Sequence, residues 1–277
     1  MSLPLLGLGT YKLKGELCAD AVVNALEFGY NLIDTARCYR NEQDIGKSLS
    51  TISRDKIFIT SKVPPDEQGE ELAYASVCDS LKKLNTAYID LMLIHWPGAS
   101  KRPPTSSENR NLRLGSWRGL IKARNEGLVK FIGVSNFTVD HLKELIEVEG
   151  LEVPFVNQVE FHPLCQQRTL LLFCTRHGVK LQAYSSLGSG ASELLQHPVI
   201  LSIATKYTLT VSALLLLWAM QQQVAVIPKA TSQKHLLDNY NVFVQYQNGF
   251  RLAEEDMNAI GELEKDHHFC WNPSTVT

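Results

Sequence analysis

Short apolar runs, rich in β-branched residues, alternate along the chain with longer segments in which apolar residues recur at helical spacing. This alternation predicts strands that are each followed by a helix. The predicted strands are residues 5–9, 32–34, 57–61, 89–95, 131–135, 155–160, 179–184 and 224–228. The predicted helices are residues 17–28, 42–50, 67–84, 114–126, 139–148, 167–177, 212–222 and 233–239.

Many of the predicted strands are apolar on both faces, which is typical of a parallel sheet covered by helices. Eight strand–helix units predict a closed (β/α)8 barrel, also called a TIM barrel. Such a barrel needs about 250 residues, so residues 1–277 are expected to form a single domain. The alternative, an open doubly wound sheet, would need a glycine-rich phosphate turn after its first strand, which residues 5–10 match only weakly.

Two segments break this rhythm. Residues 98–115 follow the fourth predicted strand and are rich in proline, serine and charge, and the tail after Leu263 contains Phe269, Trp271 and Pro273. Loops that follow barrel strands lie on the catalytic face. We therefore expect residues 98–115 to form a wall of a substrate pocket, with an ordinary surface insertion as the alternative.

Composition narrows the class of protein. The 27 basic and 29 acidic residues nearly balance, so neither nucleic acid nor a membrane is an expected partner. The first residues lack the features of a secretory signal, and the longest apolar run, residues 213–220, is far shorter than the roughly 20 residues that span a bilayer. Six cysteines without a C-x-x-C pair indicate neither a zinc site nor a disulfide framework. We expect a reduced, cytoplasmic monomer that acts on a small molecule and holds no metal.

Four polar residues lie at or just after the ends of successive predicted strands: Asp34, Tyr39, Lys62 and His95. Because barrel enzymes carry the active site at these ends, the four side chains are expected to converge. Carbonyl reduction needs a proton donor, and Tyr39 fits if Lys62 lowers its pKa while Asp34 holds the ammonium group. His95 would orient the carbonyl oxygen. The alternatives are a structural ion pair, a packing tyrosine and a core histidine.

The same positions lie within motifs that resemble those of the aldo-keto reductase family. The segments, in the family's order, are GYNLIDTA at 29–36 with Tyr39, Asn41 and Glu42 after it, DLMLIHWP at 90–97, IGVSNF at 132–137, NQVEFHP at 157–163, AYS at 183–185 and VIPK at 226–229. The resemblance covers about residues 6–273. One such motif could arise by chance, whereas this many in register are specific.

The resemblance implies an oxidoreductase that binds NADPH without a Rossmann domain and reduces aldehydes, with ketones as a second class, to alcohols. It makes Tyr39 the general acid, supported by Lys62 and Asp34, with His95 orienting the carbonyl. The cofactor would contact Thr10, Tyr11, Asp34, Ser135, Asn136, Gln158, Tyr184, Ser185, Leu187, Ser189, Lys229, His235, Asp238 and Asn239. Among these, Ser135, Asn136 and Gln158 would bind the nicotinamide amide, and Tyr184 would stack on its ring. The pyrophosphate would be lined by Ser185, Leu187 and Ser189. Lys229 would meet the 2′-phosphate, and Asp238 and Asn239 would face the adenosine. Expected substrate-pocket walls are Tyr11, Trp96, Trp117 and Trp271, with helix packing as the alternative for one or two of them.

The chain departs from the family pattern at three places. His235 stands where an arginine is common, and Ala230 stands where a phosphate-binding serine is usual. A histidine lacks the permanent charge and bidentate fork of arginine, so NADH becomes an alternative cofactor. The hairpin that usually covers the bottom of the barrel is expected to be missing, which would expose apolar side chains there.

Three other function classes compete with the reductase. A cofactor-binding regulatory subunit would bind NADPH tightly but turn over slowly, and a structural protein of the same fold would have no need of the four polar residues. A metal-dependent hydrolase would need clustered ligands such as H-x-H at strand ends, which the sequence lacks.

Overall fold

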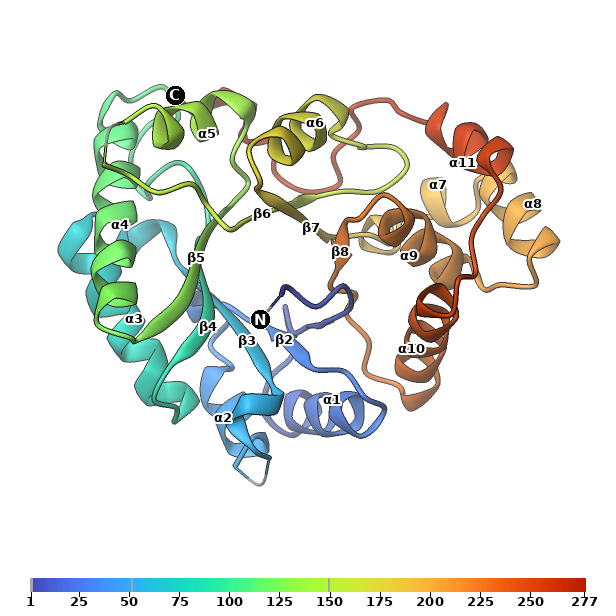
Figure 1. The fold of residues 1–277 in the computed structure, drawn as a ribbon, viewed down its shortest axis with the longest axis horizontal. Helices are drawn as coiled ribbons and strands as arrows, with labels where there is room; N and C mark the ends of the chain where they lie inside the picture. Colours follow the sequence, from blue (N-terminus) through green and yellow to red (C-terminus); the bar gives the residue numbers. More distant parts are fainter. Residues whose placement is uncertain (1, 51, 149) are drawn as a thin grey trace.

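Eight parallel strands form the centre of the molecule, in the order in which they occur along the chain (Figure 1). The computed structural model describes residues 2–50, 52–148 and 150–277. The strands are β1 (Leu8–Gly9), β2 (Leu32–Asp34), β3 (Phe58–Val63), β4 (Ile89–Ile94), β5 (Val129–Ser135), β6 (Val156–Glu160), β7 (Lys180–Tyr184) and β8 (Ala225–Val226). All eight predicted strands are therefore confirmed, although β1 and β8 are shorter than expected.

The segment before β1 joins the last strand and closes the ring. Leu6 forms a parallel bridge with Val226. The Gly7 amide donates to the Val226 oxygen at 2.9 Å, and the Val226 amide donates to the Leu5 oxygen at 2.8 Å. With these bonds every strand has two neighbours, so the predicted (β/α)8 barrel is confirmed.

Helices surround this ring (Figure 1). They are α1 (Gly15–Glu27), α2 (Glu42–Ser48), α3 (Glu70–Leu84), α4 (Glu108–Asn125), α5 (Val139–Ile146), α6 (Arg168–Arg176), α7 (Ser192–Leu195), α8 (Pro198–Lys206), α9 (Val211–Gln221), α10 (Gln233–Gln247) and α11 (Glu254–Gly261). The eight predicted helices are all present, and α10 continues well beyond residue 239. The second half of the predicted loop 98–115 is helical, because α4 begins at Glu108.

The helices α7, α8 and α11 were not predicted. Two of them carry start signals: α8 has Pro198 in its first turn, and α11 begins with Glu254, Glu255 and Asp256. Proline suits the first helical position, and acidic side chains suit the positive end of the helix dipole. The proline and the acidic residues thus indicated the starts of these two helices, which the spacing of apolar residues alone did not.

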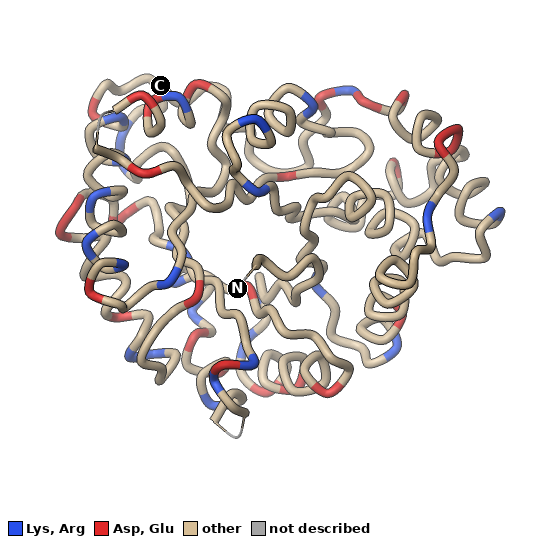
Figure 2. Tube along the Cα trace, in the orientation of Figure 1, with Lys and Arg blue, Asp and Glu red and all other residues tan. Residues whose placement is uncertain are grey.

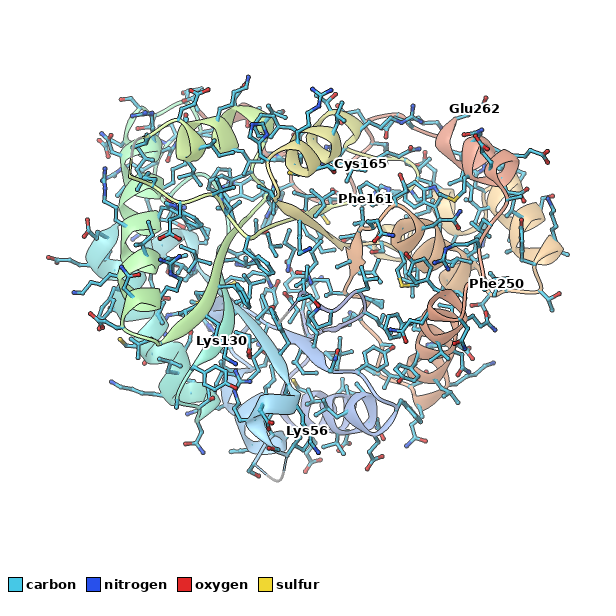
Figure 3. All side chains as sticks on the ribbon, in the orientation of Figure 1. Lys56, Lys130, Phe161, Cys165, Phe250 and Glu262 are labelled. Atoms are coloured by element: carbon cyan, nitrogen blue, oxygen red, sulfur yellow. The ribbon has the colours of Figure 1, made fainter. Side chains whose placement is uncertain are left out.

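The inside of the barrel is a packed core. Side chains from alternate strand positions, among them Leu32, Phe58 and Leu91, form one buried apolar cluster, and the side chains fill the ring in Figure 3. The bottom is covered as well, because Leu3 is buried in the same cluster and Phe131 stacks on Phe155 with centroids 4.3 Å apart. The expected exposure of apolar side chains at the barrel floor is therefore limited to partly exposed residues such as Phe131 and Phe155.

Charged residues lie mostly in the segments around the outside of the ring, with both signs interspersed (Figure 2). Among the described residues, no single helix is long and apolar enough to cross a membrane. The helices α8 and α9, which meet at 88°, pass that test only as a bent pair and only by length and composition.

Candidate active site

An ion pair lies at the centre of the site, at the carboxyl ends of β2 and β3. Lys62 Nζ is 2.6 Å from Asp34 Oδ1 and donates to the Thr35 oxygen at 2.8 Å. The Lys62 side chain is 0% exposed and the Asp34 side chain 2%. The backbone oxygen and the carboxylate together hold the ammonium group in one place.

Tyr39 and His95 lie directly above this pair. Tyr39 ends the short 3-10 helix Arg37–Tyr39 that follows β2, and its ring centroid lies 5.0 Å from Lys62 Nζ. The His95 ring meets the Tyr39 ring edge to face at 5.7 Å. The structure thus brings together all four of the predicted catalytic side chains.

Burial determines the protonation of these groups. It raises the pKa of Tyr39 well above its usual value of 10, and the nearby Asp34 carboxylate raises it further. The net shift of the Tyr39 pKa is thus upward, opposite to the lowering expected from Lys62, because burial is its largest cause. Burial also lowers the pKa of His95 to about 3, with the Lys62 charge as a second cause. At neutral pH the site presents a phenol and a neutral imidazole.

Polar side chains from β5, β6 and β7 continue the site around the ring. Gln158 Nε2 donates to Asp34 Oδ2 at 2.7 Å, and Ser135 Oγ donates to the backbone oxygen of Gln158 at 2.8 Å. Asn136, in the left-handed backbone region at φ 64°, donates to the His95 oxygen at 3.0 Å. Tyr184 OH donates to Asn136 Oδ1 at 2.7 Å. The residues predicted to meet the nicotinamide amide thus form one hydrogen-bonded group beside the ion pair.

Gln182 belongs to this group but was not predicted. It is fully buried on β7, directly opposite Gln158, and its Oε1 accepts from Gln158 Nε2 at 2.8 Å. The signal was present in the sequence, because Gln182 lies two residues before Tyr184 and so faces the same side of the strand.

The loop after β7 carries two of the predicted pyrophosphate contacts. Ser185 and Ser189 have φ values of 50° and 54°, and their hydroxyl oxygens are 3.1 Å apart. Cys270 of the C-terminal tail contacts both, with Sγ 3.3 Å from the Ser185 oxygen and 3.8 Å from the Ser189 oxygen. Nothing in the spacing of the tail indicated that Cys270 would be there. Leu187 lies half-buried between the two serines.

The predicted adenosine end lies at the start of α10. Lys229 is exposed just after β8, and the Ser232 hydroxyl caps α10 by accepting from the His235 amide at 3.2 Å. His235 is exposed in the first turn and Asp238 is half-buried one turn later, while Asn239 is buried. A lysine next to a helix N-terminus is a setting that favours a phosphate group.

Two predicted contacts are wrong for the side chains concerned. Trp117 is fully buried on the outer helix α4, where its Nε1 donates to the Glu152 oxygen at 3.0 Å. It packs barrel helices and forms no pocket wall. Thr10 is also fully buried, and its hydroxyl donates to the Asp34 backbone oxygen at 2.9 Å, so this side chain joins β1 to β2.

The remaining aromatic residues do lie at the mouth of the barrel. Tyr11 is 52% exposed with its ring 5.0 Å from that of Tyr39. Trp96, after β4, meets Trp271 of the tail edge to face at 6.4 Å, and Trp271 is 81% exposed. The loop 98–107 packs against the same tail, since the Thr277 amide donates to the Pro104 oxygen at 2.9 Å.

A cavity of about 460 Å³ adjoins this group on the side of β5 and β6. Its lining includes Asn136, Tyr184, His268 and Trp271 but neither Tyr39 nor His95. It therefore lies beside the four predicted catalytic residues, beneath the C-terminal tail.

Comparison with known proteins agrees with this geometry. A sequence model of the aldo/keto reductase family matches residues 5–265. Glyoxal reductase of Bacillus subtilis is 38% identical over 100% of this chain and 94% of its own. Methylglyoxal reductase DkgA of Escherichia coli is 35% identical over 95% of this chain and 90% of its own.

Solved structures agree in fold and sequence. The aldo-keto reductase MGS-M4, from a deep-sea metagenome library of the Medee basin, superposes with a TM-score of 0.87 at 36% identity, covering 96% of this chain and 93% of its own. An aldo-keto reductase solved with NADPH superposes with a TM-score of 0.86 at 28% identity, covering 97% and 86%. The chain belongs to the aldo/keto reductase family and is an NAD(P)H-dependent oxidoreductase that reduces carbonyl compounds.

Proposed function

We propose that this protein reduces small aldehydes and dicarbonyls to alcohols with NADPH, and that Tyr39 is the proton donor. The observation that carries the proposal is the position of Tyr39, whose ring lies 5.0 Å from the Lys62 ammonium and meets His95 edge to face. The relatives named for reduction of glyoxal and methylglyoxal support the substrate class.

The protonation states suit this chemistry. A proton donor must hold its proton until the alkoxide develops, and the raised pKa of Tyr39 keeps the phenol intact. The neutral His95 imidazole can donate one N–H to the carbonyl oxygen and so orient the carbonyl group. When bound, the nicotinamide supplies the hydride that the carbonyl carbon receives.

The residues around the barrel mouth fit such a cofactor. Asn136 and Gln158 offer amide groups beside the Tyr184 ring, which suits a carboxamide on an aromatic ring. The paired hydroxyls of Ser185 and Ser189 suit a pyrophosphate. Lys229 and the N-terminus of α10 supply the positive charge that a 2′-phosphate needs, which favours NADPH over NADH.

The pH dependence of aldehyde reduction should be flat across neutrality. Tyr39 donates only while protonated, and its raised pKa means that the proton is lost only above about pH 10. His95 stays neutral down to its lowered pKa of about 3. We expect kcat/KM at saturating NADPH to be constant between about pH 6 and pH 9. A decline centred near pH 7 to 8 would instead mean that Lys62 lowers the pKa of Tyr39 in the complex.

Restoring arginine at position 235 should sharpen the preference for NADPH. An arginine in the first turn of α10 would add a charge-assisted bond to the 2′-phosphate, worth roughly 1–3 kcal/mol, or about five- to 160-fold in affinity. His235→Arg should therefore lower the Kd for NADPH while leaving the Kd for NADH unchanged, as measured by quenching of tryptophan fluorescence. Lys234→Arg, which keeps the charge of its exposed neighbour, is the control. An equal decrease of the Kd for both cofactors would show that residue 235 does not contact the 2′-phosphate.

The direct test is an assay of the purified protein with methylglyoxal. Loss of NADPH absorbance that depends on the dicarbonyl, and that is slower with NADH, is the expected result. Tight NADPH binding without turnover on methylglyoxal or aromatic aldehydes would overturn the proposal and favour a cofactor-binding regulatory role.

A further inference from the structure

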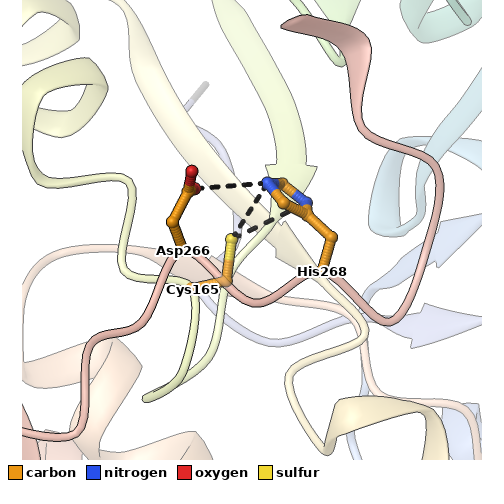
Figure 4. A group of neighbouring side chains, drawn as sticks. All are labelled: Cys165, Asp266 and His268. Carbon is orange, nitrogen blue, oxygen red and sulfur yellow. Dashed lines mark hydrogen bonds and ion pairs between the residues drawn. The ribbon is translucent and has the colours of Figure 1, made fainter.

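Three potential metal ligands from distant parts of the chain meet beside the active site (Figure 4). Cys165 lies in the connection between β6 and α6, and Asp266 and His268 lie in the tail that follows α11. Their ligand atoms all lie within 4.8 Å of one another. About a hundred residues separate Cys165 from His268, so no sequence spacing could indicate the site.

The ligand atoms are close to one another but are not yet arranged around one point. His268 Nε2 lies 3.5 Å from Asp266 Oδ1, whereas Cys165 Sγ lies 3.6 Å from Nε2 and 3.8 Å from Nδ1 and so stands beside the ring rather than along the Nε2 lone pair. Zinc binds sulfur at about 2.3 Å and nitrogen or oxygen at about 2.0–2.2 Å, which in a tetrahedron places sulfur about 3.6 Å from nitrogen and nitrogen about 3.4 Å from oxygen. The nitrogen–oxygen distance thus matches one edge of such a tetrahedron, and a turn of the Cys165 side chain toward the Nε2 lone pair would complete the site.

A buried carboxylate orients the histidine. His268 Nδ1 lies 2.9 Å from Glu160 Oε2, and Glu160 is only 2% exposed. The same carboxylate accepts from the backbone amides of Phe269 at 2.8 Å and Cys270 at 3.3 Å, so it cannot turn away. A histidine that donates one ring N–H to a carboxylate presents the lone pair of the other nitrogen, which is the usual support for a metal ligand. Here that other nitrogen is Nε2, which lies 3.5 Å from Asp266 Oδ1.

The surroundings are anionic. The carboxyl groups of Glu160, Glu264 and Asp266 all lie near the Cys165 thiol. A close turn holds the cysteine, because Cys165 N donates to the His162 oxygen at 2.8 Å. A dication here would neutralise the carboxylates and take the place of the thiol proton.

We propose that Cys165, Asp266 and His268 form a site for a divalent transition metal, with water as a fourth ligand. The mixture of thiolate, imidazole and carboxylate selects zinc rather than magnesium or calcium, which prefer oxygen ligands alone. The bound ion ties the C-terminal tail to the connection after β6. Because the same tail carries Cys270 against Ser185 and Trp271 against Trp96, occupancy of the site orders the mouth of the barrel.

The first test is zinc binding by the whole protein. Chelator-treated protein is dialysed against Zn²⁺ and its metal content is measured, with about one zinc per chain expected. Cys165→Ser and Asp266→Asn should both lose the ion. Because the Asp266 side chain is 85% exposed, Asp266→Asn should fold normally. The matched controls Cys78→Ser on α3 and His267→Gln in the tail should retain the zinc.

A second readout identifies the thiolate ligand. Cobalt in place of zinc should give a thiolate-to-metal charge-transfer band that Cys165→Ser lacks, and metal affinity should rise with pH because binding releases the thiol proton. Zinc should also raise the Tm of the wild-type protein but not that of Asp266→Asn. Failure of the wild-type protein to retain zinc, or equal retention by Cys165→Ser and Asp266→Asn, would overturn the proposal. Neither result bears on carbonyl reduction, which is assayed separately.

Discussion

Tyr39→Phe is expected to lower kcat/KM for methylglyoxal reduction by about 10²- to 10⁴-fold, the usual contribution of a positioned general acid. The phenylalanine ring would keep the contacts with Tyr11 and His95, so the pocket should retain its shape. Only the proton is lost. The Kd for NADPH, measured by fluorescence, should therefore stay close to that of the wild-type protein while turnover collapses.

The matched control is Tyr74→Phe. Tyr74 lies on the outer helix α3, and its hydroxyl donates to the carboxylate of Glu126. Loss of this hydroxyl should leave kcat/KM unchanged. If Tyr39→Phe retained more than a tenth of the activity, the proton would have to come from His95 or from water. The assignment of Tyr39 as general acid would then be wrong.

Much of this site could be predicted from the sequence, because consecutive strands of a barrel are neighbours in space. A residue at the end of one strand lies near the residue at the end of the next, so Asp34, Lys62 and His95 could be grouped without coordinates. The same rule, applied with the two-residue period of a strand, also covers Gln182.

Contacts made by the irregular tail could not be predicted in this way. Cys270 reaches Ser185, and His268 reaches Glu160, across 85 and 108 residues of chain. The tail has no periodicity from which its path could be deduced. Trp117 is a different case, because it lies within a predicted helix, and its burial follows from the face of α4 that packs on the barrel.

The pKa of Tyr39 was beyond the sequence for a physical reason. The direction in which this pKa shifts depends on how far the Tyr39 ring is removed from water. It also depends on whether the Lys62 charge acts on the phenol or is balanced by Asp34. Both are properties of the folded protein. The sequence supplies the three groups, and the burial of Tyr39, with the Asp34 charge as a second cause, decides that its pKa rises.

Lys62→Met is expected to lower the free energy of unfolding by about 3–5 kcal/mol at pH 7. The substitution keeps most of the side-chain volume but leaves the Asp34 carboxylate buried without a counter-charge. Even beside Lys62, burial already raises the pKa of Asp34. Guanidinium unfolding of the two proteins measures the difference. Lys143→Met, which breaks an exposed pair with Asp140, is the control and should cost less than about 1 kcal/mol.

The loss should depend on pH in a definite direction. Without Lys62 the pKa of Asp34 in the folded protein rises further above its unfolded value, so folding takes up a proton. Stability is then present in full below the unfolded pKa of about 4 and is lost as the pH rises through the folded pKa. Lys62→Met should therefore be more stable at pH 5 than at pH 7.

Asp34→Asn/Lys62→Met separates charge from packing. Removing the carboxylate as well should recover most of the stability at pH 7 and abolish the difference between pH 5 and pH 7, because no buried charge remains. A double variant as unstable as Lys62→Met would instead attribute the loss to the missing hydrogen bond to the Thr35 oxygen. Recovery of stability without recovery of aldehyde reduction would show that the pair is retained for its position beneath Tyr39, since a neutral substitute would then satisfy the fold but not the reaction.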